Sequence, residues 1–334
     1  MKIKFYFPRW IFPNNVGDSI NVTFVPKLLK KIYPESEITV ITHGFLIDVF
    51  KLDPNVSMVR TPEFSELSIN YHEYAMSDIK YDDNIKVIYP EWHPRLFEFW
   101  KKNHELLVNH PTVNIIIVNF LLQLKLEHLL FDPTFDFQPI CYSEIKNKPK
   151  NTFNVGIVVS SKLAGKGTPH PGCNGIGYRY SIDHWKTFTK TLKSFNKDIK
   201  IFEFSENYMN IGDEHYGYSN SIIDLIDQID YMDIGVMPDG GLHHMFNSRN
   251  KPIVLFQSNI LSKVEFLKLK NAHYPEDIHL QCRKKCRSYF SEIFGVEDLS
   301  KNCKLECENL DPIKLAEYTY KIIKQYDTDN YTPQ

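Results

Sequence analysis

Apolar and polar residues alternate at the start of the chain, over residues 2–7, and this period of two predicts a β-strand. The pattern then changes repeatedly between the periods of helices and of strands. Helices are expected over 18–32 and 46–52, and strands over 38–42, 56–60 and 85–89. Such an alternation of strands and helices is typical of a doubly wound α/β sheet.

Two longer helices are predicted next, over 93–109 and 113–130. The second lies in the most apolar run of the chain, 113–131, but six polar or charged residues interrupt this run: Asn114, Asn119, Gln123, Lys125, Glu127 and His128. A membrane-spanning helix needs about 20 predominantly apolar residues. We therefore expect a buried helix here, with peripheral contact to a membrane surface as the alternative.

The pattern restarts after a polar stretch that contains proline and ends at residue 150, which we interpret as a linker. Strands are then expected over 153–159, 199–204, 233–237 and 251–256, and helices from Ser181 onward, over 221–230 and over 311–326. The helix after Ser181 has apolar residues at helical spacing, which predicts a buried stripe: Trp185, Phe188, Leu192 and Phe195. The sequence thus predicts one domain over 1–150, a second over 151–326 and a polar tail over 327–334.

The length of 334 residues suits two domains of about 150 residues each. Lysine and arginine (39) nearly cancel aspartate and glutamate (41), and the net charge of −2 gives no sign of a nucleic-acid partner. The N-terminus lacks the long apolar core and small-residue cleavage site of a secretory signal. We therefore expect the protein in the cytoplasm, where it is free or at the inner face of the membrane.

The most informative chemical pattern lies in residues 231–258. An apolar strand ends in a short acidic and glycine-rich loop, and a helix with two adjacent histidines follows at once: Asp239, Gly240, Gly241, His243 and His244. Glycine lets the backbone approach a ligand closely, and the free N–H groups at a helix start bind anions. Ligands of open parallel sheets bind beyond the carboxyl ends of the strands. The loop is therefore expected to hold a diphosphate.

This pattern, together with a motif near the N-terminus, resembles the bacterial heptosyltransferases of glycosyltransferase family 9. The N-terminal motif is Val16-Gly17-Asp18-Ser19-Ile20. The segment 239–244, with Lys251-Pro252 after it, is similar to the Asp-Thr-Gly-x-x-His motif of the family, although Gly240 replaces the threonine. The resemblance implies a GT-B fold, which is an α/β fold of two doubly wound Rossmann-like domains with an interdomain cleft.

The resemblance also implies a function. It implies an inverting glycosyltransferase without a catalytic metal, which moves a sugar, heptose being the expected one, from ADP-heptose to a lipopolysaccharide-core or capsule-type glycan, free or lipid-linked. The N-terminal domain would bind the acceptor and the C-terminal domain the nucleotide sugar. Asp18 stands at the family's position for the base that deprotonates the acceptor hydroxyl. Without the resemblance, a helix cap is the preferred explanation of Asp18.

Further residues are expected around the diphosphate. Backbone donors of Asp239, Gly240 and Gly241 would bind it, and His244 would add a side-chain donor, unless it is an ordinary helix histidine. The family places a cation near the diphosphate, for which Arg179 is preferred, Lys166 is second and Lys162 is also available. An acidic residue for the ribose or sugar hydroxyls is expected after the strand over 199–204, and three candidates stay unranked: Glu203, Glu206 and Glu214.

Four of the six cysteines form two closely spaced pairs: Cys282 with Cys286, and Cys303 with Cys307. Relatives often have cysteines in this region. Two such pairs are compatible with a structural zinc or iron site. Reduced thiols and disulfides remain open as alternatives. No metal is expected to take part in the transfer itself.

Two other functions would use the same diphosphate loop. A sugar-nucleotide epimerase of GT-B shape needs acid and base groups on both faces of the sugar and no acceptor. A non-catalytic sugar-binding relative is the second alternative, because Gly240 lacks the hydroxyl that the family's threonine offers to the donor phosphate.

Overall fold

A computed structural model describes fourteen segments of the chain: residues 2–7, 20–61, 84–88, 93–110, 112–113, 115–143, 152–159, 180–205, 207–217, 221–238, 241–256, 269, 271–275 and 310–330. The chain divides into two compact units. The first comprises residues 1–144 with the short segments 221–226 and 265–270, and the second comprises the remainder.

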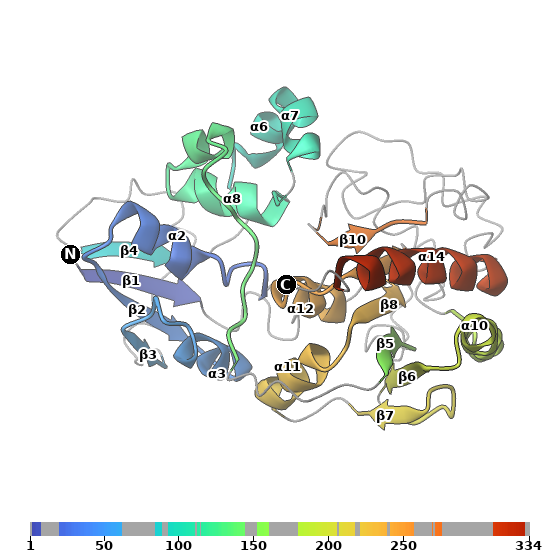
Figure 1. The fold of residues 1–334 in the computed structure, drawn as a ribbon. Coiled ribbons are helices and arrows are strands. Elements are labelled where there is room, and N and C mark those ends of the chain that lie inside the picture. Colours follow the sequence, from blue (N-terminus) through green and yellow to red (C-terminus); the bar gives the residue numbers. More distant parts are fainter. Residues whose placement is uncertain are drawn as a thin grey trace, which may run out of the picture. The chain divides into compact units, whose positions relative to one another are not determined.

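The first unit contains a parallel sheet with the strand order β3-β2-β1-β4 (Figure 1). Its strands are β1 (Lys2–Phe7), β2 (Glu37–Thr42), β3 (Met58–Arg60) and β4 (Asn84–Ile88). β1 lies between β2 and β4 and pairs in parallel with both. The chain therefore builds the sheet outward from β1 in one direction and then returns to its other side, as expected for a doubly wound sheet.

The helices of the first unit are shorter than the sequence pattern predicts. They are α2 (Val25–Ile32), α3 (Phe45–Lys51), α6 (Leu96–Lys102), α7 (His104–Asn109), α8 (Ile115–Gln123) and the 3-10 helix η1 (Glu127–Phe131). The helix predicted over 18–32 is interrupted, because residues 21–24 form turns between the helical Ile20 and α2, which begins at Val25. Pro26 explains this boundary, since proline fits the first turn of a helix but breaks its interior.

The two long helices predicted over 93–109 and 113–130 are also divided. Asn103 ends α6 and begins α7, and its side-chain Nδ2 donates to the carbonyl of Phe99 at 2.8 Å. Asparagine competes in this way with the helical backbone. Lys125 has φ of 55° and lies in the turn between α8 and η1, where the second predicted helix is divided. Among the described helices, none is long and apolar enough to cross a membrane.

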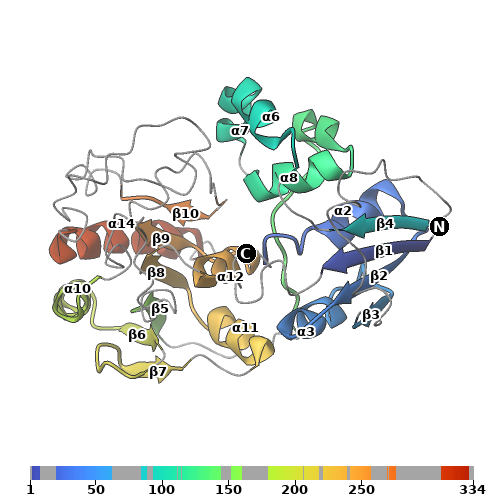
Figure 2. The same cartoon turned by 180° about the vertical axis from the view of Figure 1, so that it is seen from behind.

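The second unit contains a parallel sheet of six strands in the order β10-β9-β8-β5-β6-β7 (Figure 2). The strands are β5 (Phe153–Val158), β6 (Ile199–Phe204), β7 (Glu214–Tyr216), β8 (Ile234–Pro238), β9 (Ile253–Phe256) and β10 (Ala272–His273). The first three run outward from β5 in one direction, and the next three run outward from β8 in the other. This is the strand order of a Rossmann fold, and it confirms the predicted α/β class.

The helices of the second unit are α10 (Ile182–Phe195), α12 (Gly241–Ser248), α14 (Pro312–Asn330) and the second part of α11 (Ile222–Asp230), whose first residues, up to Ile226, belong to the first unit. Ser181 caps α10 as predicted, because its hydroxyl accepts the backbone N–H of His184 at 3.1 Å. Three residues of the predicted stripe are buried: Trp185, Phe188 and Leu192. The prediction is wrong for Phe195, which is 39% exposed and stacks on Tyr320 of α14 at the edge of the core.

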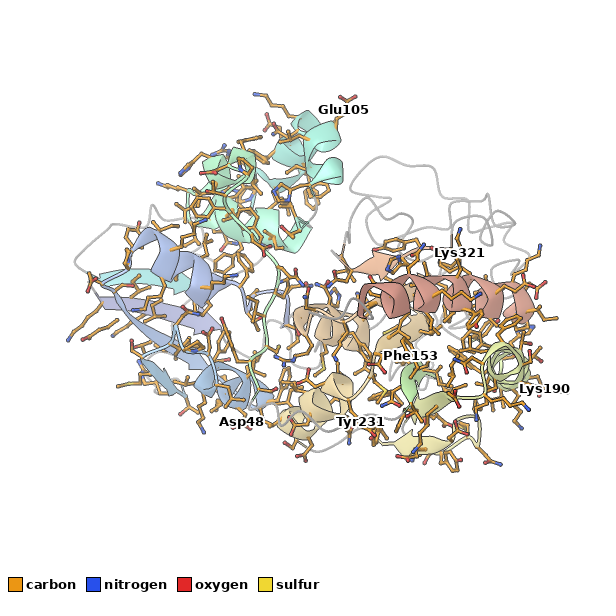
Figure 3. All side chains as sticks on the ribbon, viewed as in Figure 1. Asp48, Glu105, Phe153, Lys190, Tyr231 and Lys321 are labelled. Atoms are coloured by element: carbon orange, nitrogen blue, oxygen red, sulfur yellow. The ribbon has the colours of Figure 1, made fainter. Side chains whose placement is uncertain are left out.

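The start of β5 is bound to the turn that joins α11 and β8. Figure 3 labels Phe153 on β5 and Tyr231 after α11. The side chain of the buried Asn154 donates to the carbonyl of Tyr231 at 3.0 Å, and its backbone N–H donates to the carboxylate of Asp233 at 2.7 Å. These bonds hold β8 in register beside β5. The strand order of the sheet reverses between these two strands.

Candidate functional site

The carboxyl ends of β5 and β8 lie side by side. The two strands pair in parallel, with Gly156 opposite Gly235 and Ile157 opposite Val236. The segments that follow them therefore leave the sheet at the same edge. In open α/β sheets, the point where the strand order reverses is where a ligand-binding crevice forms. The chain after β5 contains Lys166 and Arg179, and the chain after β8 contains the predicted diphosphate loop.

Two glycines bring α12 close to the sheet. A Cβ atom on Gly235 would lie 2.8 Å from Cδ1 of Phe246, and one on Gly156 would lie 3.1 Å from Cζ of the same ring. Real Cβ atoms essentially never approach heavy atoms to less than 3.0 Å. Phe246 is fully buried and fills the space that the glycine pair leaves. The start of α12 is therefore fixed at the edge where β5 and β8 end.

All residues of α12 after Gly241 are buried, although several of them are polar. His243 is 1% exposed and His244 is 5% exposed. Their ring centroids lie 3.8 Å apart, with an angle of 43° between the ring planes. No acidic residue lies in the first turn of α12, so within the described helix its positive N-terminal end is not neutralised.

Both imidazoles are neutral at neutral pH. Burial lowers the pKa of His244 to about 3. Burial also lowers the pKa of His243 well below its usual value, and the nearby His244 lowers it further. A neutral imidazole has one N–H donor and one acceptor. Within the described residues, Nδ1 of His244 is buried and has no hydrogen-bond partner.

The carboxylate of Glu203 binds the loop that follows β6. Its side chain is fully buried at the end of β6, and its carboxylate accepts backbone N–H groups of Met209 at 2.7 Å and Ile211 at 3.0 Å. It also accepts the hydroxyl of Ser205 at 2.6 Å. Between the parallel strands β6 and β7, the described residues 205 and 207–213 contain no crossover helix. The carboxylate satisfies the N–H groups of this connection, so it is occupied by its own loop.

The other two acidic candidates after β6 differ from Glu203. Glu214 lies on the edge strand β7, is 45% exposed and forms an ion pair with Lys200. Glu206 lies outside the described residues. The structure therefore separates candidates that the sequence left unranked, because Glu203 and Glu214 already have partners.

Lys251, which belongs to the family-like Lys-Pro pair, caps the end of α11. Its Nζ donates to the carbonyls of Asp230 and Met232, each at 2.8 Å. The carboxylate of Asp230 in turn accepts two hydrogen bonds from Arg249, at 2.7 and 2.9 Å, and this ion pair is almost buried. A lysine at a helix C-terminus satisfies carbonyls that the helix itself leaves open. Lys251 thus holds α11, β9 and the end of α12 together.

Of the predicted site residues, Gly241 and His244 lie on α12, and the structure adds His243 to them. The other predicted site residues lie outside the described residues: Asp18, Lys162, Lys166, Arg179, Asp239, Gly240, Cys282, Cys286, Cys303 and Cys307. Within the described segments, no group of three or more His, Cys, Asp or Glu side chains is placed to hold a metal ion. The glycine pair beneath α12 was missed, although each glycine interrupts an otherwise apolar strand pattern, which signals a close approach of another element.

No protein-family model matches the chain, and no curated protein sequence matches it. Solved structures do match over nearly its whole length. ADP-heptose lipopolysaccharide heptosyltransferase II of E. coli has a TM-score of 0.60 at 13% identity, covering 98% of this chain and 100% of that chain. A family 9 glycosyltransferase from Veillonella parvula has a TM-score of 0.61 at 13% identity, covering 97% of both chains.

A third similar structure is the dodecameric iron-containing heptosyltransferase TibC in complex with ADP-D-β-D-heptose. It has a TM-score of 0.54 at 10% identity, covering 98% of this chain and 78% of that chain. At such identities the similarity concerns the fold. The chain has the GT-B fold of the heptosyltransferases of glycosyltransferase family 9.

Proposed function

We propose that the protein is a glycosyltransferase that moves a sugar, with heptose as the expected one, from a nucleotide-sugar donor to a glycan hydroxyl. The observation that carries the proposal is the buried histidine-bearing helix α12, which begins where the strand order of the second sheet reverses. ADP-heptose is the proposed donor, since TibC is known in complex with ADP-D-β-D-heptose and shares this fold. The proposed acceptor is a lipopolysaccharide-core or capsule-type glycan, free or lipid-linked.

The donor diphosphate would bind at the start of α12. Gly241 and the N–H groups of the first turn offer backbone donors, and the helix dipole favours a negative group there. His244 has unused hydrogen-bonding capacity within the described residues, which supports a role as a ligand rather than as an ordinary helix histidine. Asp239 and Gly240 would complete the loop, and Arg179 or Lys166 would approach from the segment after β5.

The transfer would be a single displacement with inversion. Asp18, on the segment that follows β1, would accept the proton of the acceptor hydroxyl while its oxygen attacks the anomeric carbon. The bond between that carbon and the diphosphate oxygen breaks, and the electron pair stays on the leaving nucleoside diphosphate. β1 is the strand at which the order of the first sheet reverses, so Asp18 follows the strand expected to border a ligand site.

Glu206 is the remaining candidate for binding the ribose or sugar hydroxyls. Its two rivals are engaged elsewhere, because Glu203 binds its own loop and Glu214 pairs with Lys200. Changing Glu206 to Gln should raise the KM for the donor several-fold and leave thermal stability unchanged. An unchanged KM would remove Glu206 from the donor site.

The four clustered cysteines would hold a structural metal, remain reduced or form disulfides, and these alternatives stay open. The iron in TibC supports the metal alternative. Metal analysis of the purified protein, before and after substitution of Cys282 and Cys303 by Ser, separates the metal site from the two metal-free alternatives. A metal that is present in the parent protein and lost in the variants supports a structural site, and a metal-free parent protein excludes it.

Asp18→Asn is the decisive test of the transfer mechanism. The variant should bind the donor with unchanged affinity and transfer sugar at least a hundredfold more slowly, since general base catalysis contributes about 10²–10⁴. Asp48→Asn is the matched control, because Asp48 is an exposed aspartate of α3 in the same unit (Figure 3). Transfer at a near-parental rate by Asp18→Asn would refute the assignment of the base.

Binding of ADP, GDP, UDP and CDP sugars to the parent protein and to Asp239→Ala tests the donor site. One nucleotide sugar should bind to the parent protein and bind at least tenfold more weakly to the variant. Product analysis without an acceptor distinguishes an epimerase, which converts its substrate alone. If none of the nucleotide sugars binds to the parent protein, the proposed function is wrong.

A further inference from the structure

The rings of two adjacent histidines lie against each other in the first turns of α12. Successive residues of an α-helix point about 100° apart, so neighbouring side chains do not normally lie against each other. The rings of His243 and His244 nevertheless lie with their centroids 3.8 Å apart and their planes tilted by 43°. Both rings are buried, so this contact forms inside the protein and next to the positive end of the helix.

The elements around the pair offer few charges. β8 and β9 pack against α12, and β5 lies beside β8. These three strands have no ionisable side chain. β6 has Lys200 and Glu203, which are engaged in an ion pair and in loop hydrogen bonds respectively. At the C-terminal end of α12, Arg249 pairs with Asp230. Asp239, which precedes the helix, lies outside the described residues.

We propose that the His243–His244 pair takes up one proton when a nucleoside diphosphate binds at the N-terminus of α12. This inference rests on the proposed function, because it requires the diphosphate site. The balance is simple: two neutral rings, one nucleoside diphosphate and one solvent proton combine, and the proton occupies the lone pair of one ring nitrogen. No covalent bond of the ligand changes in this step.

The empty site disfavours the proton and the occupied site favours it. Without a ligand, burial keeps the pKa of His244 at about 3, so the ring is neutral at neutral pH. An anion in contact with a buried imidazole stabilises the charged form and raises its pKa. The neighbouring ring limits the uptake to one proton, because two imidazolium ions at a separation of 3.8 Å would repel each other strongly.

The proton would also serve the proposed transfer. When the bond from the anomeric carbon to the diphosphate breaks, the leaving group gains one negative charge. An imidazolium that already faces the diphosphate balances this charge without a rearrangement of solvent. His244 would be the ring in contact with the diphosphate. His243 would be a positioning residue that holds the ring of His244 and keeps the empty site neutral.

The test is isothermal titration calorimetry with ADP, GDP, UDP and CDP as probes, in several buffers of different ionisation enthalpy. At about pH 8, free nucleoside diphosphates are fully ionised, and the slope of enthalpy against buffer ionisation enthalpy gives the proton uptake. Binding of the nucleotide should be accompanied by a net proton uptake. The affinity should therefore rise as the pH is lowered from about 8, by up to tenfold for each pH unit.

His244→Gln should still bind the nucleotide, more weakly, with proton uptake close to zero. His243→Phe retains an aromatic ring against His244 and should keep most of the uptake. Unfolding of a variant would also abolish proton uptake. His243→Phe and thermal melting of each variant show whether a lost uptake has this cause. His128→Gln, which changes an exposed histidine of η1, is the matched control and should behave like the parent protein.

Two results separate this inference from the function on which it rests. Binding of a nucleoside diphosphate without proton uptake, or with an uptake that survives in a folded His244→Gln variant, overturns the proton coupling and leaves the glycosyltransferase proposal intact. If none of the four nucleoside diphosphates binds to the parent protein, both proposals fail together.

Discussion

Gly235→Ala tests whether the glycine pair sets the position of α12. The added Cβ would lie 2.8 and 2.9 Å from Cδ1 and Cε1 of Phe246, and it would also meet the terminal methyl of Met237. The methionine end can move at little cost. The Phe246 ring is fully buried, so it has to shift together with the helix. Forcing extra volume into a packed core typically costs about 1–3 kcal/mol.

A smaller gain offsets part of this cost. Replacing glycine restricts the unfolded chain and stabilises a protein by about 0.4–1 kcal/mol where the native backbone accepts the change. The net loss for Gly235→Ala is therefore about 1–2 kcal/mol. Gly156→Ala should cost less, because its nearest contacts lie at 3.0–3.1 Å. Gly217→Ala is the matched control, since among the described residues its Cβ would meet one atom, Cε1 of His215 at 3.7 Å.

Chemical denaturation of the three variants and the parent protein measures these differences. The expected order of stability is Gly217→Ala, then Gly156→Ala, then Gly235→Ala, with a midpoint near that of the parent protein for the first. Because Phe246 moves with α12, the affinity for the donor nucleotide should fall together with stability in Gly235→Ala. The argument is refuted if Gly235→Ala unfolds at the same denaturant concentration as Gly217→Ala.

Three further predictions concern the same unit. Glu203→Leu leaves the N–H groups of Met209 and Ile211 without their acceptor. The free energy of unfolding measured in urea should fall by about 2–5 kcal/mol. An unchanged free energy would show that the loop does not depend on the carboxylate. Lys251→Met removes both bonds to the end of α11 and should lower the free energy of unfolding by about 1–3 kcal/mol in the same assay. Lys321→Met, on the exposed face of α14, is the control and should leave it unchanged (Figure 3). The ligand-free protein should lose stability below about pH 6.5, because an unfolded His244 binds a proton there and the buried one does not until about pH 3. At about pH 5 the part of this loss that is due to His244 amounts to about 2 kcal/mol, and a loss of the same total size in His244→Gln would contradict the assignment.

The sequence pattern predicted element types better than their limits. β6 spans the predicted residues 199–204, and α11 begins within one residue of its predicted start, because these segments have one clear period and polar ends. The failures have local causes that compete with the period. Pro26 delays α2, and the side chain of Asn103 separates α6 from α7. Phe195 has helical spacing, but the core beside α10 ends before it.

The diphosphate loop was predictable because its chemistry is local: glycines and a helix start are adjacent in the sequence. The features beside it depend on contacts between distant segments. The alignment of Gly156 with Gly235 follows from the register of β5 and β8, which no single segment encodes. Glu203 and Glu214 look alike in the sequence, and only the path of residues 205–213 shows that one binds its own loop and the other a surface lysine.

Strand order explains why the proposed site residues come from separate parts of the sequence. In each unit the chain begins at an inner strand, adds strands on one side, and then returns to the other side of the first strand. The loops that follow β5 and β8 therefore start at one edge, although the first residues after these strands are about 80 positions apart in the sequence. The same order places the segment with Asp18 after β1, which pairs with both β2 and β4. A substitution that shifts the pairing of β5 and β8, such as loss of the Asn154 side-chain bond to the carbonyl of Tyr231, should thus weaken nucleotide binding without touching the nucleotide. Asn154→Leu, measured by nucleotide titration on folded protein, tests this dependence, and unchanged affinity would show that the site does not rely on this register.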